Sequence, residues 1–341
     1  MSDATIPFRQ KVIPQTVSRI LITGAGGFVG RHALAAFAGK LGAGDALAGI
    51  GRAMPAEQSD RVERRSIDLL DGPALTAFVA AFRPTHILHL AALSSVQQSA
   101  GSAGETWRSN VLGLLNLAEA VAQGAPGATV VFASSGEVYG RAFLSGEPVD
   151  EAARPQPANV YARTKLAGED LLGDVLPAAG VKLIVLRPFN HVGPGQDERF
   201  VVPSFAGQVA RIEAGLVPPV VEVGDLSARR DFLDVADVVA AYSAVIERSD
   251  ELADRSVFNI ASGIARPISD ILATFRAKAR LPFEIRVARD RLRPSEIPTA
   301  SGDASALVAA VGWRPRVPWD TSLAAILDDA RSRLSTTTSK E

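Results

Sequence analysis

Three polar side chains in the middle of the chain, Ser135, Tyr161 and Lys165, have the types and spacing for acid–base chemistry. Tyr161 and Lys165 are four residues apart, so a helix would place them on one face. An ammonium group nearby favours the ionised phenol, and we therefore expect the pKa of Tyr161 to lie below its ordinary value of about 10. Ser135 follows an apolar run and could hydrogen-bond a reacting oxygen while Tyr161 transfers a proton. Taken singly, each motif is more often a packing or capping feature.

A glycine cluster near the start of the chain has the spacing of a loop that binds a diphosphate. Gly24, Gly27 and Gly30 form G-x-x-G-x-x-G after the apolar run 18–23 and at the start of a predicted helix over 30–41. One glycine permits a tight turn, the next lets the backbone approach a pyrophosphate, and the third lets helix and strand pack closely. This strand–glycine–helix order predicts a dinucleotide cofactor.

The end of the second predicted strand favours NADP(H), with NAD(H) as the alternative. The chain reads Ile50-Gly51-Arg52 there, without the carboxylate that would accept a hydrogen bond from a ribose 2′-hydroxyl. The planar guanidinium of Arg52 could bind a 2′-phosphate, although a solvated surface arginine is the alternative. Asp68 follows the next strand and could accept from the adenine amino group or cap a helix.

The elements that must position these residues follow a repeated strand–helix rhythm. Short apolar runs separated by helix-length segments occur at 18–23, 46–50, 86–91, 129–133 and 182–186. Right-handed crossovers then give an α/β fold, a Rossmann-type doubly wound parallel sheet with helices on both faces. Beyond Pro188 the rhythm weakens, which is typical of a smaller α/β substrate lobe.

We divide the chain accordingly. The expected units are a flexible arm over 1–18, a NAD(P)-binding Rossmann domain with the catalytic residues over 19–187, a mainly substrate-binding lobe over 188–330 with some segments returning to the sheet, and a polar tail over 331–341.

Composition excludes several classes of function. The chain has 341 residues, a formal net charge of −1 and no cysteine, which argues against nucleic-acid or anionic-membrane partners, disulfides and thiolate catalysis. Its four histidines have no metal-ligand spacing, and no apolar stretch approaches the roughly 18 residues of a membrane span. We therefore expect a cytoplasmic protein without a metal.

The motifs, in order, resemble those of extended short-chain dehydrogenases/reductases of the NAD-dependent epimerase/dehydratase type. The resemblance runs from about Arg19 to about Leu327 and is carried by the glycine cluster, Asp68, H89-L-A-A, Asn110, S134-S-G-E-V-Y-G and Y161-x-x-x-K165. It implies that Ser135, Tyr161 and Lys165 are the catalytic triad, with Lys165 also holding the nicotinamide ribose. The cofactor contacts that it implies are Gly24, Gly27, Phe28, Val29, Gly30, Arg52, Asp68, Leu69, Leu90, Ala91, Ala92, Asn110, Tyr161, Lys165 and Pro188.

Four phrases in the second half resemble a branch of this family that handles GDP-linked 6-deoxy sugars, the GDP-4-keto-6-deoxy-mannose reductases. They are RPFNHVGPGQ (187–196), FVVPSFA (200–206), RRDFLDV (229–235) and RPSEIP (293–298). The substrate contacts implied by this resemblance are Ser135, Asn190, Val202, Pro203, Arg230, Arg293 and Glu296. Each arginine, taken singly, is more often part of a surface ion pair.

The tripeptide Ser135-Gly136-Glu137 bears on the reaction. The dehydratases of this family read Thr-Asp-Glu or Thr-Ser-Glu, whereas Gly136 offers no acidic side chain. Glu137 stands where their catalytic base would be, so we keep it as a candidate catalytic residue; otherwise it would hydrogen-bond a neighbouring backbone group.

The expected reaction is NADPH-dependent reduction of the C4 keto group of a nucleotide-linked 4-keto-6-deoxyhexose, giving GDP-rhamnose or its C4 epimer. The alternatives are a redox-neutral, NAD-dependent 4-epimerase or 4,6-dehydratase and, more remotely, a non-catalytic dinucleotide-binding sensor. The segments 110–121 and 165–172 resemble the four-helix homodimer face of the family.

Overall fold

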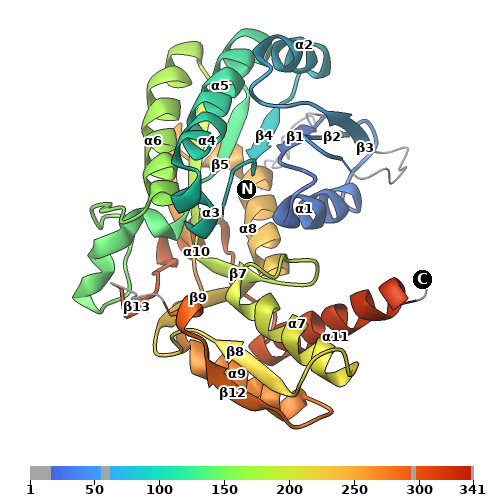
Figure 1. Cartoon of the computed structure of the whole chain (residues 1–341). Helices are drawn as coiled ribbons and strands as arrows, with labels where there is room; N and C mark the ends of the chain where they lie inside the picture. Colours follow the sequence, from blue (N-terminus) through green and yellow to red (C-terminus); the bar gives the residue numbers. More distant parts are fainter. Residues whose placement is uncertain (1–16, 55–61, 95, 293–296, 339–341) are drawn as a thin grey trace, which may run out of the picture.

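The structure is a computed structural model that describes residues 17–54, 62–94, 96–292 and 297–338. Its centre is a seven-stranded parallel sheet with the strand order β10-β6-β5-β4-β1-β2-β3. Figure 1 labels five of these strands, which follow one another as β5, β4, β1, β2 and β3. This is the predicted doubly wound sheet, whose strand order reverses between β1 and β4. Its strands are β1 (Arg19–Thr23), β2 (Ala46–Gly51), β3 (Val62–Ser66), β4 (His86–His89), β5 (Thr129–Ala133), β6 (Lys182–Pro188) and β10 (Arg255–Ile260).

Helices cover both faces of the sheet because its strands are apolar on both sides. In β1, Ile20 and Ile22 belong to one buried cluster while Leu21, pointing the other way, belongs to a second. The first cluster includes α1 (Phe28–Ala38), α8 (Val235–Glu247) and α10 (Ser305–Val311); the second includes α2 (Gly72–Phe82), α5 (Gly113–Gly124) and α6 (Val160–Val175). Between β4 and α5 lie α3 (Val96–Gly101), α4 (Ala103–Trp107) and the π-helical turn η1 (Arg108–Leu112).

A smaller lobe lies below the carboxyl ends of the strands in the view of Figure 1. Its apolar core joins Phe205, Val209, Phe275 and Leu323, which come from three helices. Those helices are α7 (Val201–Glu213), α9 (Ile268–Lys278) and α11 (Trp319–Thr338), accompanied by the parallel pair β8 (Val220–Val223) and β12 (Glu284–Val287). A separate small sheet contains β7 (Asn190–Val192), β9 (Arg229–Asp234), β11 (Ala265–Pro267) and β13 (Thr299–Ala300).

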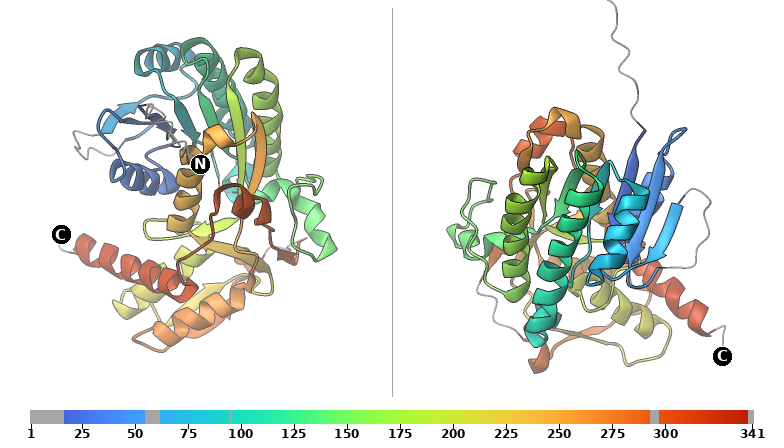
Figure 2. Two further views of the ribbon diagram at one scale, coloured as in Figure 1. Left: turned by 180° about the vertical axis from the view of Figure 1, so that it is seen from behind. Right: turned by 90° about the horizontal axis from the view of Figure 1, so that it is seen from above.

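The chain crosses between the two parts several times. After the lobe segments α7 to β9, it returns with α8 and then β10, which pairs with β6 at the edge of the large sheet, as the view from behind in Figure 2 shows. The turn η2 (Gly136–Ser145) follows β5, and the short turns η3 (Pro177–Ala179), η4 (Ser249–Glu251) and η5 (Arg289–Arg291) complete the described elements. None of the described helices is both long and apolar enough to cross a membrane.

Two local details differ from the sequence-based expectations. Helix α1 begins at Phe28 instead of Gly30, with Gly27 at its N-cap. The side chain that caps α2 is Asp71, which accepts from the amide of Ala74 at 3.1 Å, so Asp68 is not the cap of this helix.

Candidate active site

A pocket of about 700 Å³ opens at the carboxyl ends of the central strands, at the switch point between β1 and β4. Open parallel sheets place their ligands at this point because the two neighbouring crossover connections run to opposite faces. Its wall combines the β1–α1 turn, the loops after β2, β3 and β4, the end of β5, the first turns of α6, and residues 188–202 of the lobe. The pocket therefore joins the predicted cofactor end to the predicted catalytic end.

The glycine turn is shaped by close backbone packing. Gly24 has φ +69°, and a Cβ there would lie 2.6 Å from the Ala91 nitrogen. A Cβ on Gly30 would lie 2.2 Å from the Gly24 oxygen, so the helix packs directly on the turn. Helix α1 starts at the pocket wall with no side-chain cap and no acidic residue in its first turn. Its first amides can therefore donate to an anion such as a diphosphate.

The far end of the pocket holds the two residues predicted to contact the adenosine half of the cofactor. Arg52, exposed beyond the end of β2, and Asp68, exposed beyond β3, both line the pocket. One carboxylate oxygen of Asp68 accepts from the Leu70 amide at 3.0 Å. Four further predicted cofactor contacts also line the pocket: Leu69, Leu90, Ala91 and Ala92.

The catalytic residues converge at the other end. Helix α6 places Tyr161 and Lys165 on its buried face, and Asn159 caps the helix by accepting from the Ala162 amide at 2.8 Å. The Lys165 ammonium donates to the Ala133 carbonyl at 2.6 Å and lies 4.9 Å from the centre of the Phe132 ring. Ser135, the second residue after β5, hydrogen-bonds with the Tyr161 phenol. All three predicted catalytic side chains thus meet at one point of the pocket.

The electrostatics of the site differ from the sequence-based expectation. Burial raises the pKa of Tyr161 to about 12, while its hydrogen bond with Ser135 lowers it and the charge of Glu137 raises it further. Burial lowers the pKa of Lys165 to about 7, against the opposing effect of Glu169. The expectation of a lowered tyrosine pKa was wrong because desolvation of the phenolate outweighs the lowering effect of the hydrogen bond with Ser135.

Glu137 faces the same end of the pocket. Its carboxylate accepts from the Asn159 side chain at 3.1 Å, and not from a neighbouring backbone group, which was the alternative to a catalytic role. It also interacts electrostatically with Tyr161 and with Arg230, whose pKa is lowered by burial and raised by the charge of Glu137. A charge at this position therefore acts directly on the Tyr161 phenol.

Several predicted residues lie elsewhere or outside the described structure. Asn110 is buried and does not line the pocket; it accepts from the Leu93 amide at 2.8 Å and donates to the Thr164 hydroxyl at 3.0 Å. It therefore ties the loop after β4 to α6. Pro203 is buried within α7, and Arg230 donates to the Arg229 and Pro298 carbonyls; neither is among the pocket-lining residues. Arg293 and Glu296 lie outside the described residues.

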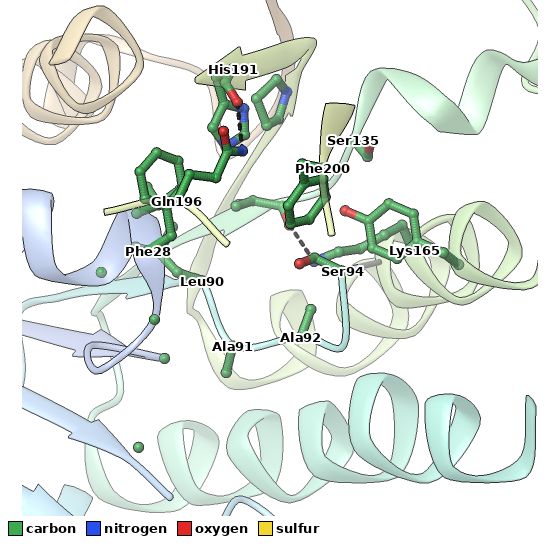
Figure 3. A pocket seen from close by; sticks show the side chains of 18 of the residues that line it. Phe28, Leu90, Ala91, Ala92, Ser94, Ser135, Lys165, His191, Gln196 and Phe200 are labelled. Carbon is green, nitrogen blue, oxygen red and sulfur yellow. Dashed lines mark hydrogen bonds between the residues drawn. The ribbon is translucent and has the colours of Figure 1, made fainter. Parts of the chain in front are cut away.

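The structure adds His191 and Gln196 as further pocket residues (Figure 3). His191 stacks on Phe28, with ring centres 6.3 Å apart, and its Nδ1 donates to the Phe189 carbonyl at 3.0 Å. Burial lowers the pKa of His191, which leaves it neutral at neutral pH. The Gln196 amide nitrogen donates to the His191 carbonyl at 3.0 Å.

This amide bond fixes the orientation of the Gln196 side chain. Its Oε1 is then left buried, with no hydrogen-bond partner in the described part of the chain. Because an unpaired buried acceptor is costly, this oxygen suits a hydroxyl or amide donor on a bound ligand. Among the described residues, no group of three or more histidine, cysteine, aspartate or glutamate side chains is arranged to hold a metal ion.

The Gln196 loop is fastened to the Rossmann domain. Arg31 of α1 donates to the Gly26 carbonyl at 3.1 Å and to the Gly195 carbonyl at 3.1 Å, and so bridges the glycine turn and this loop. The His32 ring hydrogen-bonds the Pro194 carbonyl at 3.0 Å. The first amides of α1, the glycine turn and the unpaired Gln196 oxygen together fit a nicotinamide dinucleotide that extends from Arg52 to Lys165.

The sequence is similar to those of known proteins over most of its length. The model of the NAD dependent epimerase/dehydratase family matches residues 20–261. Over 316 residues the chain is 34% identical to GDP-6-deoxy-D-mannose reductase of Pseudomonas aeruginosa, which covers 93% of this chain and 98% of that protein.

Solved structures agree over nearly the whole chain. The structure of RMD from Pseudomonas aeruginosa complexed with NADPH has a TM-score of 0.79 and 33% identity, covering 93% of this chain and all of that one (100%). The UDP-glucose 4-epimerase of Thermus thermophilus, in complex with NAD, has a TM-score of 0.79 and 29% identity, covering 92% and 99%. The similarity thus extends both to a reductase and to an epimerase.

Proposed function

The chain belongs to the NAD-dependent epimerase/dehydratase family, and we propose that it uses NADPH to reduce the C4 keto group of a nucleotide-linked 4-keto-6-deoxyhexose. The favoured substrate is GDP-4-dehydro-6-deoxy-D-mannose, and the product is GDP-D-rhamnose or its C4 epimer. The similarity to GDP-6-deoxy-D-mannose reductase over 93% of the chain supports this choice of substrate class.

The packing at Gly136 is the observation that favours a reductase over a dehydratase. A Cβ at this position would lie 3.0 Å from ring atoms of Phe189, so an acidic side chain there would require the ring to move. The proposed triad supplies the groups of a carbonyl reduction, whereas Gly136 lacks the additional acid expected of a 4,6-dehydratase, and a larger side chain there would require Phe189 to shift.

The residues present account for the proton side of a reduction. When bound, NADPH supplies the hydride to the C4 carbonyl carbon and leaves as NADP⁺. Ser135 donates a hydrogen bond to the carbonyl oxygen, and Tyr161 transfers its proton to that oxygen, which completes the secondary alcohol. Because burial raises the pKa of Tyr161 to about 12, the phenol is in its protonated, donating form at neutral pH. The Lys165 ammonium holds the nicotinamide ribose and stabilises the phenolate that remains.

Arg52 supports NADPH as the cofactor. It is an exposed cation at the pocket wall beyond β2, where a 2′-phosphate needs a counter-charge. The NADPH bound in the Pseudomonas structure supports the same choice, while the NAD of the Thermus epimerase keeps NAD(H) as a second candidate.

For the substrate, we propose contacts from both parts of the chain. Asn190 and Val202 line the pocket, and Arg230 interacts with Glu137 at its edge. We assign Asn190 to the sugar diphosphate, Val202 and Pro203 to the nucleotide, Arg230 and Arg293 to the phosphates, and Glu296 to the nucleotide ribose.

A redox-neutral 4-epimerase or dehydratase is the second candidate function, favoured by one feature. Glu137 lines the pocket and acts on Tyr161 electrostatically, so a carboxylate is available as a base. Such an enzyme would oxidise its substrate with bound NAD and return the hydride to the intermediate, which regenerates the NAD, whereas the proposed reductase exchanges its cofactor at each turnover.

The destination of the hydride tests the proposed function. The protein would be incubated with NADPH carrying deuterium at the transferred C4 position and with GDP-4-keto-6-deoxy-mannose, and the product analysed by NMR and mass spectrometry. We expect one deuterium at C4 of a GDP-6-deoxyhexose, while UDP- and dTDP-linked keto sugars react more slowly. A product without deuterium, or a substrate left unreduced, would contradict the proposal.

A further inference from the structure

A buried ion pair lies directly behind the catalytic residues. Tyr161, Lys165 and Glu169 follow one another at four-residue intervals on α6, so they share one face of the helix. Glu169 and its partner Arg187 on β6 are each 6% exposed, and neither is among the residues that line the pocket. The pair therefore lies too deep to touch a ligand, yet adjoins the groups that do.

Three hydrogen bonds converge on the Glu169 carboxylate. The Nε of Arg187 donates to its Oε1 at 3.0 Å, and the Nη2 donates to its Oε2 at 2.6 Å, which gives a two-pronged ion pair. The hydroxyl of Ser134 donates to Oε1 as well. Since Ser134 precedes Ser135, the carboxylate anchors the backbone that presents the catalytic serine.

Arg187 also connects the site to β10, at the edge of the large sheet. Its Nη1 donates to the Tyr139 hydroxyl at 3.0 Å, and that hydroxyl donates to the Asn259 side chain on β10 at 2.8 Å. Asn259 in turn donates to the Val149 and Asp303 carbonyls at 3.1 and 3.0 Å. The geometry of the ion pair is thus fixed from several sides.

The charge of Glu169 reaches Lys165. Burial works against the ammonium, and Glu169 raises the pKa of Lys165 in opposition. The other charged or titratable groups facing these two side chains are Tyr161, His89 on β4 and Arg187. His89 is neutral at neutral pH, because burial and then the Lys165 charge lower its pKa to about 3.

We propose that Glu169, with Arg187 as its counter-ion, is a positioning residue that keeps the Lys165 amine charged and holds the Ser134–Ser135 segment in place. It acts on the proposed reductase through these two neighbours and contacts neither cofactor nor substrate. The proposal concerns the same catalytic set as the proposed function, but its first test requires no turnover.

That test follows the Lys165 amine directly. In protein labelled with ¹³C at the lysine ε-carbons, the Lys165 signal is assigned by its absence from a Lys165→Met variant and followed by NMR against pH. In Glu169→Gln we expect its midpoint to fall by about one pH unit, because loss of a nearby opposite charge disfavours the charged amine. Asp174→Asn, which removes an exposed carboxylate from the same helix, should leave the midpoint unchanged. An unchanged midpoint in folded Glu169→Gln would overturn the proposal.

A second variant separates positioning from folding. Glu169→Gln leaves a buried arginine without its counter-ion and is expected to be destabilised, whereas Glu169→Gln/Arg187→Gln removes both charges and should recover much of the lost stability. The proposal predicts that the Lys165 midpoint stays low in the double variant. If the double variant recovered both its stability and the wild-type Lys165 midpoint, the pair would have a structural role alone. Loss of the fold in both variants would lead to the same conclusion.

Turnover provides an independent readout. With active enzyme, the alkaline limb of kcat/KM should move to lower pH by the same amount in both variants, because a less basic Lys165 loses its proton earlier. Absence of turnover in the wild type would contradict the reductase assignment and leave the NMR result standing.

Discussion

At the scale of single residues, the site combines a protonated phenol with a buried amine that can lose its charge near neutrality. Burial raises the pKa of Tyr161 to about 12 and lowers that of Lys165 to about 7. The two groups are therefore tuned by the same desolvation, in opposite directions, because in each case the neutral form is favoured. This tuning suits a site in which the tyrosine gives up a proton and the lysine must be kept charged by its surroundings.

Replacing Tyr161 by phenylalanine tests the proton donor. The change removes one hydroxyl from a buried ring, and general acid catalysis typically contributes about 10²–10⁴-fold, so kcat should fall by that order. NADPH binding, measured by fluorescence titration, should change less than about twofold. Turnover close to that of the wild type would exclude Tyr161 as the donor.

Arg52 is the residue for cofactor choice. In Arg52→Ala, a lost hydrogen-bonded charge contact of about 1.5–3 kcal/mol should weaken NADPH binding by roughly 10–100-fold and leave NADH binding nearly unchanged. Titration of both cofactors checks this. Arg65→Ala is the matched control, since Arg65 is exposed on the neighbouring strand β3 and pairs with Glu63. Equal loss for both cofactors, or an equal effect of the control, would refute the role of Arg52.

Family resemblance and spacing together predicted that Ser135, Tyr161 and Lys165 meet: the resemblance implied the set, and the four-residue spacing places Tyr161 and Lys165 on one helix face. They did not suffice for the direction of the Tyr161 pKa shift, which depends on burial. Nor could they predict the free acceptor of Gln196, because it results from a bond to the His191 carbonyl that only the folded loop makes. The sequence indicated this loop only through the phrase RPFNHVGPGQ (187–196), which gave no role to its last residue, Gln196.

At the scale of elements, strand β4 ends in a histidine whose side chain is buried. His89 is 1% exposed, and its Nδ1 lies 2.8 Å from the Thr23 hydroxyl of β1. Burial, and then the charge of Lys165, lower its pKa to about 3. In the unfolded chain, His89 binds a proton below the ordinary histidine pKa of about 6.5, whereas in the folded state it stays neutral until much lower pH.

This exclusion makes the stability of the fold sensitive to acid. Because the unfolded state binds more protons below pH 6.5, the free energy of unfolding should fall by roughly 3 kcal/mol between pH 6.5 and 4 through His89 alone. Denaturant unfolding at several pH values measures this slope. A His89→Gln variant should be less stable at pH 7 but show a shallower acid slope; the same slope in both proteins would contradict the assignment.

Several element boundaries could be predicted, and the exceptions have local causes. Apolar runs identified β1, β2, β4, β5 and β6, since buried parallel strands are apolar on both faces. The edge strand β3, VERRS, carries mostly charged residues and was not identified as an apolar run. Helix α1 starts before Gly30 because the glycine turn ends at Gly27, and Asp71 caps α2 because Asp68 lies three residues too early.

At the scale of the whole molecule, the lobe was the part least accessible from sequence. Its core joins side chains of α7, α9 and α11, which are separated by long stretches of chain that contribute β10 to the large sheet and β9, β11 and β13 to the small one. No local pattern predicts such pairings, whereas the Rossmann sheet repeats one unit with a fixed handedness.

We further propose that two copies associate through the helical segments 110–121 and 165–172. Leu112, 47% exposed at the end of η1, lies within this face. A Leu112→Glu substitution should convert a dimer into a monomer, as measured by sedimentation velocity, because a buried unpaired charge is unfavourable in an interface. Leu144→Glu is the control, since Leu144 is exposed on η2 outside both segments. A wild-type monomer, or a dimer insensitive to Leu112→Glu, would refute this interface.

The most direct test of the central claim is whether the cofactor is consumed. Purified protein would be mixed with NADPH and a limiting, known amount of GDP-4-keto-6-deoxy-mannose, and the absorbance of the reduced nicotinamide followed to completion, with NADH in parallel. We predict the loss of one NADPH for each keto sugar, and a slower reaction with NADH. No loss with either cofactor, together with tightly bound NAD released on denaturation, would contradict the reductase and favour the redox-neutral alternative.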